Sequence, residues 1–220
     1  MAVHHRASPE LAAQVRDGLP GEGHTVVQAD LTDADAIKSM VDQAHQELGG
    51  LDVLVNNAAV YLEHAITEVS YEQWQQAWEQ TLRVNLIGQV NATWCAVQYM
   101  KNTGGRIINV SSRGAIRGEL RHPAYAASKG ALNATTGSLA RALAPYDIAV
   151  TAVSPGYVDT EMAAEHLNSR IGDEIRAQSP FNRVGTPEEI AAAVIYLASP
   201  EAIWASGTNI DLNGASYLRP

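Results

Sequence analysis

The feature that most constrains this fold is the alternation of short apolar runs with longer helical stretches along the chain. Runs such as Leu51 to Asn56 (LDVLVN) and Arg106 to Ser111 (RIINVS) are apolar in their interiors rather than at every second position. That pattern is typical of strands buried on both faces. Strands alternating with helices predict a parallel sheet covered by helices on each side. We expect a single α/β domain over residues 1–220, a doubly wound parallel sheet.

Capping and turn residues set the expected boundaries. Ser8 before Pro9 predicts a helix start, and Gly49 and Gly50 predict a helix end. The expected strands are residues 3–5, 24–29, 51–56, 106–111, 148–153 and 208–212. The expected helices are residues 9–17, 71–101, 124–143 and 187–198, together with a helix that Thr32 or Asp33 caps and that runs to residue 48. A break near Thr81 within the helix 71–101 is left open. Residues 160–181 are expected to be less regular.

Composition excludes several classes of partner. The formal net charge of -9 argues against nucleic acid or an anionic membrane. No run of about 18 apolar residues is present, so no transmembrane helix is expected. The single cysteine, Cys95, lies in an apolar helical stretch and is expected to pack in the core, which favours a reducing cytoplasm as the setting. The seven histidines show no paired ligand spacing, so no catalytic metal is expected.

One spacing suggests acid–base chemistry. Tyr125 and Lys129 are four apart at the start of an expected helix, on one face. A phenol with a pKa of about 10 is a poor proton carrier near neutral pH, and a nearby ammonium lowers that pKa. Ser112 follows a strand, at the sheet edge where open α/β folds bind ligands. The spacing alone is weak, because an ordinary exposed helix face would give it as often.

Other motifs in a fixed order strengthen the argument. The chain resembles the short-chain dehydrogenase/reductase family, close to its beta-ketoacyl-reductase-like branch, over essentially its whole length. The motifs that carry the resemblance are DLTD at 30–33, LDVLVNNAA at 51–59, Asn85-Leu86, GRIINVSS at 105–112, YAASKGAL at 125–132, VSPGYVDT at 153–160, GTPEEIA at 185–191 and SGTNIDLNG at 206–214.

The resemblance implies reversible hydride transfer between a nicotinamide cofactor and a carbonyl or secondary alcohol. It implies that Tyr125 is the general acid–base and that Lys129 lowers the pKa of Tyr125 and binds the nicotinamide ribose. It also implies that Ser112 orients the substrate oxygen and that Asn85 holds a water in a proton relay. The residues it places against the cofactor are Asp30 and Leu31 at the adenine, Asn57 and Ala58 in the groove, and Pro155, Gly156, Val158 and Thr160 near the nicotinamide. Asp30 and Thr160 have a plainer alternative as helix caps, and Asn56 as a structural residue bonded to neighbouring backbone.

The front of the chain departs from the family pattern. Family members begin with a strand and a glycine-rich turn that holds the pyrophosphate at a helix N-terminus. This chain starts at what resembles the second strand, so we expect the first βα unit to be missing. In the family's sheet order, 3-2-1-4-5-6-7, the missing strand is a central one, and its loss would leave unpaired backbone groups on both neighbouring strands. The glycines of GLPGEG (18–23) lie after a helix and before a strand, the reverse of the required order, and predict a connecting turn. Three explanations of this departure are open. In the first, the start is cut or misassigned. In the second, the first strands re-pair or exchange between subunits. In the third, the chain is a rearranged homologue that has lost the cofactor and serves as a non-catalytic structural or binding subunit.

Cofactor choice, assembly and substrate are further expectations. His4, His5 and Arg6 end the first strand where an acidic residue would bind the ribose of NAD, so Arg6 favours NADP through its 2'-phosphate, with NAD left open. The resemblance suggests a homodimer or homotetramer built from the long helices. The candidates for that face are Trp78, Trp94 and Leu139. Residues 161–182 are expected to cover a small-molecule substrate whose identity the sequence leaves open.

Overall fold

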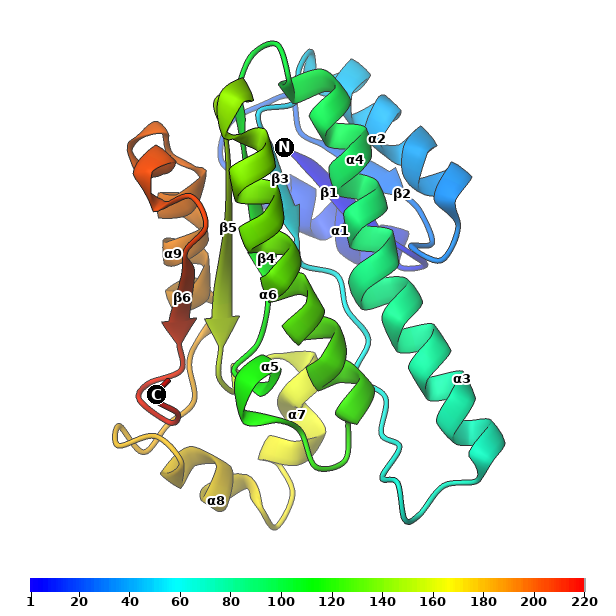
Figure 1. The fold of residues 1–220 in the computed structure, drawn as a ribbon, viewed down its shortest axis with the longest axis vertical. Coiled ribbons are helices and arrows are strands. Elements are labelled where there is room, and N and C mark those ends of the chain that lie inside the picture. The colour runs from blue at the N-terminus through cyan, green and yellow to red at the C-terminus, as the bar shows by residue number, and fades with distance from the viewer. Residues whose placement is uncertain (220) are drawn as a thin grey trace.

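The computed structural model describes residues 1–219 as parallel strands that alternate with helices (Figure 1). All strand pairings are parallel, as expected. The strands are β1 (Ala2–His5), β2 (Thr25–Gln28), β3 (Val53–Asn56), β4 (Gly105–Val110), β5 (Ile148–Pro155) and β6 (Asn209–Leu212). The helices are α1 (Pro9–Asp17), α2 (Ala34–Leu48), α3 (Tyr71–Leu82), α4 (Gln89–Met100), α5 (Gly114–Arg117), α6 (Pro123–Leu143), α7 (Glu161–Leu167), α8 (Gly172–Ala177) and α9 (Pro187–Ala198).

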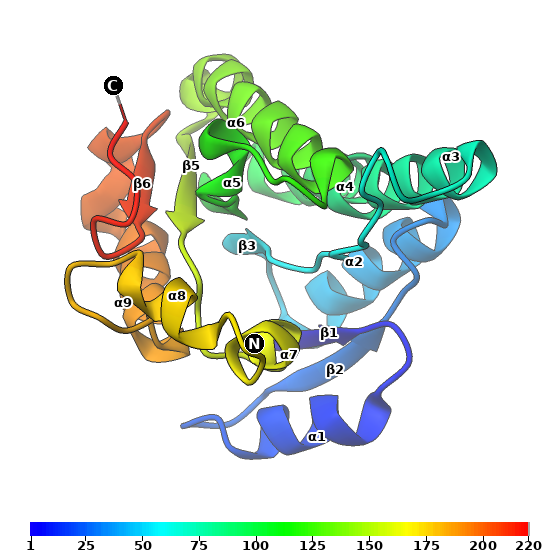
Figure 2. The same cartoon turned by 90° about the horizontal axis from the view of Figure 1, so that it is seen from below.

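The strands form two sheets rather than one. β1 pairs with β2, and a separate four-stranded sheet runs in the order β3-β4-β5-β6. Among residues 1–219 no ladder joins β1 to β3, and the two sheets stand apart in the view from below (Figure 2). Val53 and Val55 of β3 remain 37% and 40% exposed, whereas the β5 interior is buried. The orders β1-β2 and β3-β4-β5-β6 match the family's sheet order without its first strand, and the missing first βα unit stays a prediction.

Alternate side chains of the central strands pack into two cores. Ile107 of β4 and Val150 of β5 belong to one cluster, which includes Met100 and Ala140 from the helices α4 and α6. The next residue, Ile108, belongs with Leu197 of α9 to the other. Because successive strand residues point to opposite faces, this division places α9 across the sheet from α4 and α6. It explains why the strand interiors are continuous apolar runs.

Local signals account for most helix boundaries. Asp33 accepts hydrogen bonds from the backbone N–H groups of Asp35 and Ala36, and Gly49 ends α2 in the left-handed conformation. Pro9 begins α1 as predicted, although the side chain of Ser8 makes no capping bond. The GLPGEG segment connects α1 to β2, as expected.

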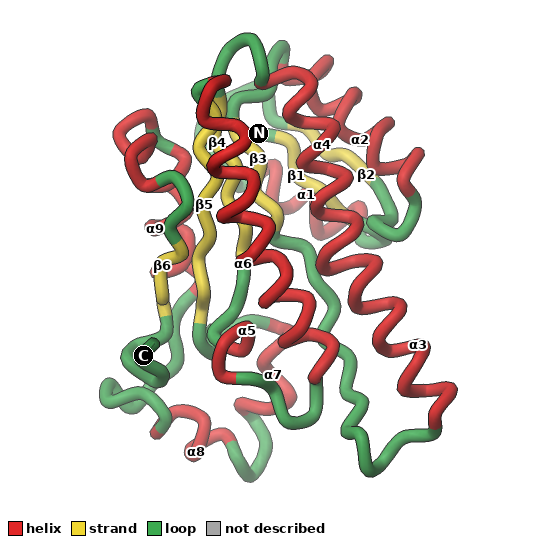
Figure 3. The backbone as a smooth tube through the Cα atoms, viewed as in Figure 1, coloured by secondary structure: helices red, strands yellow, loops and turns green. Residues whose placement is uncertain are grey.

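Two regions differ from the sequence expectation. The helix expected over residues 71–101 contains a π-helical stretch, Arg83–Gly88, between α3 and α4. The region from 160 to 181 contains α7 and α8, which the sequence did not indicate; with the long loop after β3, they surround the carboxyl ends of the central strands (Figure 3). Among residues 1–219, no helix has both the length and the apolar character needed to cross a bilayer.

Candidate active site

A cavity of about 470 Å³ lies at the carboxyl ends of β3, β4 and β5. This is the edge at which open α/β sheets bind ligands. Nine of the residues expected in the site line it. They are Ser112, Tyr125 and Lys129 together with Asn57, Ala58, Pro155, Gly156, Val158 and Thr160.

Tyr125 and Lys129 lie in the first two turns of α6. Helical spacing brings the Lys129 Nζ to 5.7 Å from the centre of the Tyr125 ring. The ammonium donates a hydrogen bond of 2.6 Å to the backbone oxygen of Val110, at the end of β4. Lys129 is 1% exposed, and burial lowers its pKa to about 8.

The electrostatics of Tyr125 differ from the sequence expectation. Burial raises the pKa of Tyr125 to about 12, and a hydrogen bond with the Ser112 hydroxyl opposes that rise. The expected lowering of this pKa by Lys129 is wrong for this structure, because loss of solvent around the phenol dominates and the Lys129 ammonium is itself desolvated. Tyr125 therefore remains a neutral phenol near neutral pH.

Ser112 follows β4, and its Oγ accepts a 3.0 Å hydrogen bond from the backbone N–H of Gly114 at the start of α5. This bond fixes the hydroxyl beside Tyr125. The preceding residue, Ser111, also lines the cavity, but it is 3% exposed and its Oγ donates to the backbone oxygen of Lys129 at 3.3 Å. Of the two serines, Ser112 is the one whose hydroxyl lowers the pKa of Tyr125.

Asn85 lies in the π-helical stretch and is fully buried. Its side chain clamps the loop after β3: Oδ1 accepts from the N–H of Val60 at 2.8 Å, and Nδ2 donates to the Val60 oxygen at 2.9 Å. Nδ2 also approaches the Ser128 Oγ at 3.3 Å. Asn85 is not among the residues that line the cavity, so its expected role in a water relay stays a prediction.

The residues expected at the adenine end lie outside the cavity. Asp30 follows β2, and its Oδ1 accepts from both the N–H and the hydroxyl of Thr32 at 2.8 Å; these bonds lower the pKa of Asp30. The cap of α2 is Asp33, so Asp30 is not that cap. Arg6 follows β1, is exposed, and adds to the lowering of the Asp30 pKa. Leu31 is buried in the core.

Sequence reasoning missed several cavity residues. Tyr61, Arg113, Glu119, Tyr157 and His166 line the same cavity as Tyr125. They come from segments expected to be loops or irregular structure, where no periodicity marks an inward-facing position. The loop at 112–123 carries two of them, and the expected apolar cover contributes Met162 and Ala163 from α7.

Comparisons with known proteins identify the family of this chain. Residues 1–214 match a family model described as enoyl-(acyl carrier protein) reductase. This chain belongs to the short-chain dehydrogenase/reductase family. It is 41% identical to an oxidoreductase of Methylorubrum extorquens over 97% of the chain and 86% of that relative. It is 37% identical to a 3-oxoacyl-(acyl-carrier-protein) reductase of Thermotoga maritima over 92% of the chain and 80% of that relative.

Solved structures of the family superpose closely on the chain. The crystal structure of a short-chain dehydrogenase/reductase of the glucose/ribitol dehydrogenase type from Brucella melitensis gives a TM-score of 0.89 at 33% identity, covering 99% of this chain and 86% of that one. A dehydrogenase/reductase from Sinorhizobium meliloti also gives 0.89, at 28% identity, covering 99% and 84%. The chain is therefore an oxidoreductase of the short-chain dehydrogenase/reductase family with the α/β fold of its relatives.

Proposed function

We propose that this short-chain dehydrogenase/reductase interconverts a carbonyl compound and a secondary alcohol with NADP(H), or with NAD(H). The observation that carries the proposal is that Ser112 and Tyr125 line one cavity whose floor holds the buried Lys129 amine. Three groups capable of holding one substrate oxygen and moving one proton thus converge at the carboxyl edge of the sheet.

The cavity lining suits the nicotinamide end of the cofactor. The Lys129 ammonium has three donors and, among residues 1–219, one hydrogen-bond acceptor, the Val110 oxygen. The remaining donors fit the hydroxyls of a ribose. Asn57, Ala58 and Val158 line the same wall, and their backbone and small side chains suit a flat ring and its carboxamide. When bound there, the nicotinamide supplies or accepts the hydride.

The chain's own residues move the proton. In the reducing direction the Tyr125 hydroxyl donates its proton to the carbonyl oxygen, and a pKa of about 12 keeps that proton in place at neutral pH until the oxygen becomes basic. Ser112 donates a second hydrogen bond to the same oxygen and holds it against the phenol. Lys129 lies at the floor of the same cavity, with its Nζ 5.7 Å from the centre of the Tyr125 ring, and its free donors hold the ribose of the cofactor rather than the phenol.

The proposal includes the cofactor preference, the assembly of the chain and its cellular setting. Arg6 follows β1, is exposed and lies close enough to Asp30 to lower its pKa, and a guanidinium can pair with a 2'-phosphate, which supports a preference for NADPH. Trp94 is 63% exposed on α4 and supports assembly with further copies through that helix, whereas Trp78 and Leu139 are partly buried. The single buried cysteine supports a cytoplasmic setting.

The test replaces Tyr125 by Phe, which removes one hydroxyl and keeps the ring. We expect NADPH-dependent ketone reduction to fall by about 10²- to 10⁴-fold while circular dichroism and thermal unfolding stay unchanged. Tyr146→Phe is the matched control, since Tyr146 is 50% exposed and absent from the cavity lining. Activity in Tyr125→Phe equal to that of Tyr146→Phe would remove Tyr125 from the mechanism and with it the proposal.

A second candidate function is a non-catalytic structural or binding subunit. The unpaired facing edges of β1 and β3 favour it, because the cofactor-binding edge of the sheet is interrupted there. Calorimetric titration of NADPH and then NADH into the folded chain separates the two candidates. Saturable binding supports the enzyme, and no binding by a folded chain supports the subunit.

A further inference from the structure

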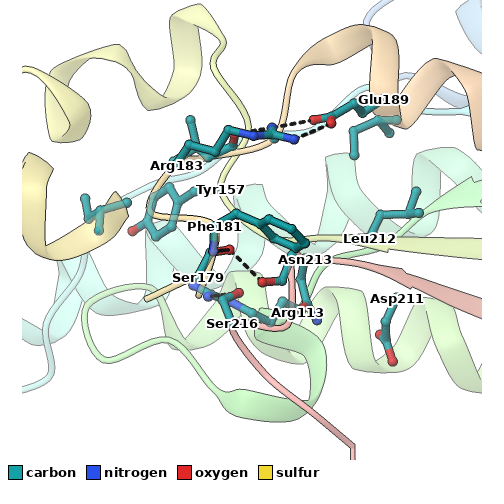
Figure 4. Close-up of a pocket in the computed structure, with 15 residues that line it drawn as sticks. Arg113, Tyr157, Ser179, Phe181, Arg183, Glu189, Asp211, Leu212, Asn213 and Ser216 are labelled. Atoms are coloured by element: carbon teal, nitrogen blue, oxygen red, sulfur yellow. Dashed lines mark hydrogen bonds and ion pairs between the residues drawn. The ribbon is translucent and has the colours of Figure 1, made fainter. Parts of the chain in front are cut away.

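Arg113 is a buried cation at the boundary of two cavities. It follows Ser112 directly, is 4% exposed, and lines both the active-site cavity and a second cavity of about 350 Å³. Its guanidinium carbon lies 5.6 Å from the centre of the Tyr157 ring, and Tyr157 also lines both cavities. Figure 4 shows Arg113 beside Ser216 in the wall of the second cavity. The two side chains thus form a shared wall within reach of a substrate held at Tyr125.

Arg113 lacks a counter-ion among the residues that the structure describes. Its Nη1 donates a 2.6 Å hydrogen bond to the neutral Ser216 hydroxyl, and its buried Nε has no partner. No carboxylate of residues 1–219 lies within ion-pair distance of it. A buried guanidinium without an anion is costly, because the charge has lost its hydration and gained little in return.

The other charged groups around the second cavity are already paired. Arg183 holds Glu189 through two hydrogen bonds of 2.8 and 2.6 Å, drawn as dashed lines in Figure 4. Asp211 is held by Arg219 at 2.6 Å. The walls therefore present one unneutralised charge, that of Arg113, and the group that would neutralise it carries one negative charge.

Glu119 lines the active-site cavity with Arg113 but makes no ion pair with it among residues 1–219. Its Oε2 instead accepts a long hydrogen bond, 3.4 Å, from the Tyr61 hydroxyl. Burial raises the pKa of Glu119, and the charge of Arg113 opposes that rise. The guanidinium of Arg113 therefore keeps its donors free for a ligand.

We infer that Arg113 binds a carboxylate of the substrate, so that the enzyme acts on an oxo acid or the corresponding hydroxy acid. This inference rests on the proposed function and names its substrate class. The reacting carbon lies at Tyr125, and the carboxylate lies at the wall formed by Arg113 and Tyr157. A planar guanidinium fork matches a carboxylate through two parallel hydrogen bonds, and a single arginine balances a single negative charge better than a phosphate dianion.

The test compares acids with their neutral esters. The probes are 3-oxobutanoate, 4-oxopentanoate and 5-oxohexanoate, each beside its methyl ester, so that three spacings between carbonyl and carboxylate are covered. Binding is measured by calorimetry on the 220-residue chain with oxidised NADP present, a condition in which ketones are not reduced. We expect at least one acid to bind tenfold or more tightly than its ester, and Arg113→Gln to remove that difference while leaving ester binding unchanged.

Two further variants keep the test decisive. Arg117→Gln is the matched control, since Arg117 is the exposed last residue of α5, the helix that Arg113 precedes, and it lines neither cavity; its Nη1 donates to Gln178 at 3.4 Å, and the variant should keep the preference for the acid. Should Arg113→Gln fail to fold by circular dichroism, Arg113→Lys keeps the charge without the fork and should lose part of the preference.

Three results would overturn the inference: acids that bind no more tightly than esters, no binding of either probe, or a folded Arg113 variant with the full preference. Reduction of the neutral methyl esters with NADPH is scored separately and tests the proposed function. Turnover of the esters without any preference for acids would leave the oxidoreductase intact and refute only the carboxylate site.

Discussion

Replacing Lys129 by Met should flatten the dependence of stability on pH. Burial lowers the pKa of Lys129 from 10.5 to about 8. Between these values the unfolded chain binds a proton that the folded protein has released, so unfolding becomes harder as pH rises. The stabilisation is fully present above the unfolded pKa and is lost as pH falls through the folded one. From about pH 8 to pH 10 this single group adds about 2 kcal/mol to the free energy of unfolding, at 1.36 kcal/mol per pKa unit.

Titration of Tyr125 sets the upper limit of the pH range in which the effect of Lys129 can be measured. Its pKa is raised from 10.0 to about 12, so its contribution has the opposite sign: it is fully present below the unfolded pKa and is lost as pH rises through the folded one. Burial also raises the pKa of Cys95 from 9.0, but groups present in both proteins cancel when wild type is compared with Lys129→Met.

The assay is urea unfolding followed by tryptophan fluorescence at pH 7, 8, 9 and 10. Wild type minus Lys129→Met should give a difference that changes by about 2 kcal/mol across the upper part of this range. Lys101→Met is the matched control, because Lys101 is exposed and its Nζ bonds only to Gln98. Parallel pH curves for wild type and Lys129→Met would show that the amine keeps its ordinary pKa and would refute the electrostatic argument for the site.

Three other predictions concern the cofactor and the fold. Arg6→Asp should shift the ratio of NADPH to NADH affinity by tenfold or more toward NADH, measured by calorimetry, and an unchanged ratio would take Arg6 out of the 2'-phosphate site. Gly88→Ala should destabilise the protein by about 1–3 kcal/mol in urea unfolding, because the new Cβ would overlap the Leu31 carbonyl and lie 2.7 Å from the Leu31 Cβ. Gly137→Ala is the control and should be neutral or stabilising, because its Cβ would meet nothing within 4 Å. Equal effects of the two substitutions would contradict this packing argument. Asn109→Ala should cost about 1–3 kcal/mol by chemical denaturation, because it removes one of the two acceptors of the buried Asn56 amide, and no loss would mean the network is dispensable.

The sequence was sufficient for elements whose signals are local. The αL glycine at 49 and the aspartate cap at 33 fixed the ends of α2, because backbone N–H and C=O groups at helix ends need partners close in the chain. The strand interiors were identified by apolar runs. The short helices α7 and α8 were missed because they cover a cavity with a few side chains each and show no long amphipathic period.

The hydrogen-bond partners of Asn56 could not be predicted from its neighbours in the sequence. The sequence suggested that it bonds neighbouring backbone, but its Nδ2 donates to the Thr93 Oγ1 at 3.0 Å and to the Asn109 Oδ1 at 2.9 Å. Asn109 in turn donates to the Thr136 Oγ1 at 2.9 Å. These partners lie on other elements, 37 and 53 residues away for the two contacts of Asn56. Only packing of α4 and α6 against the sheet brings them together.

The sequence by itself determined the parallel α/β class and most helix and strand boundaries, because these depend on spacing along the chain; it singled out Ser112, Tyr125 and Lys129 through the resemblance carried by motifs in a fixed order. The tertiary structure alone decided the division into two sheets, the position of Arg113 between two cavities, and the protonation behaviour of Tyr125 and Lys129. A pKa depends on how much water remains around a group and on which charges face it. Both are set by elements distant in sequence, so no local pattern encodes them.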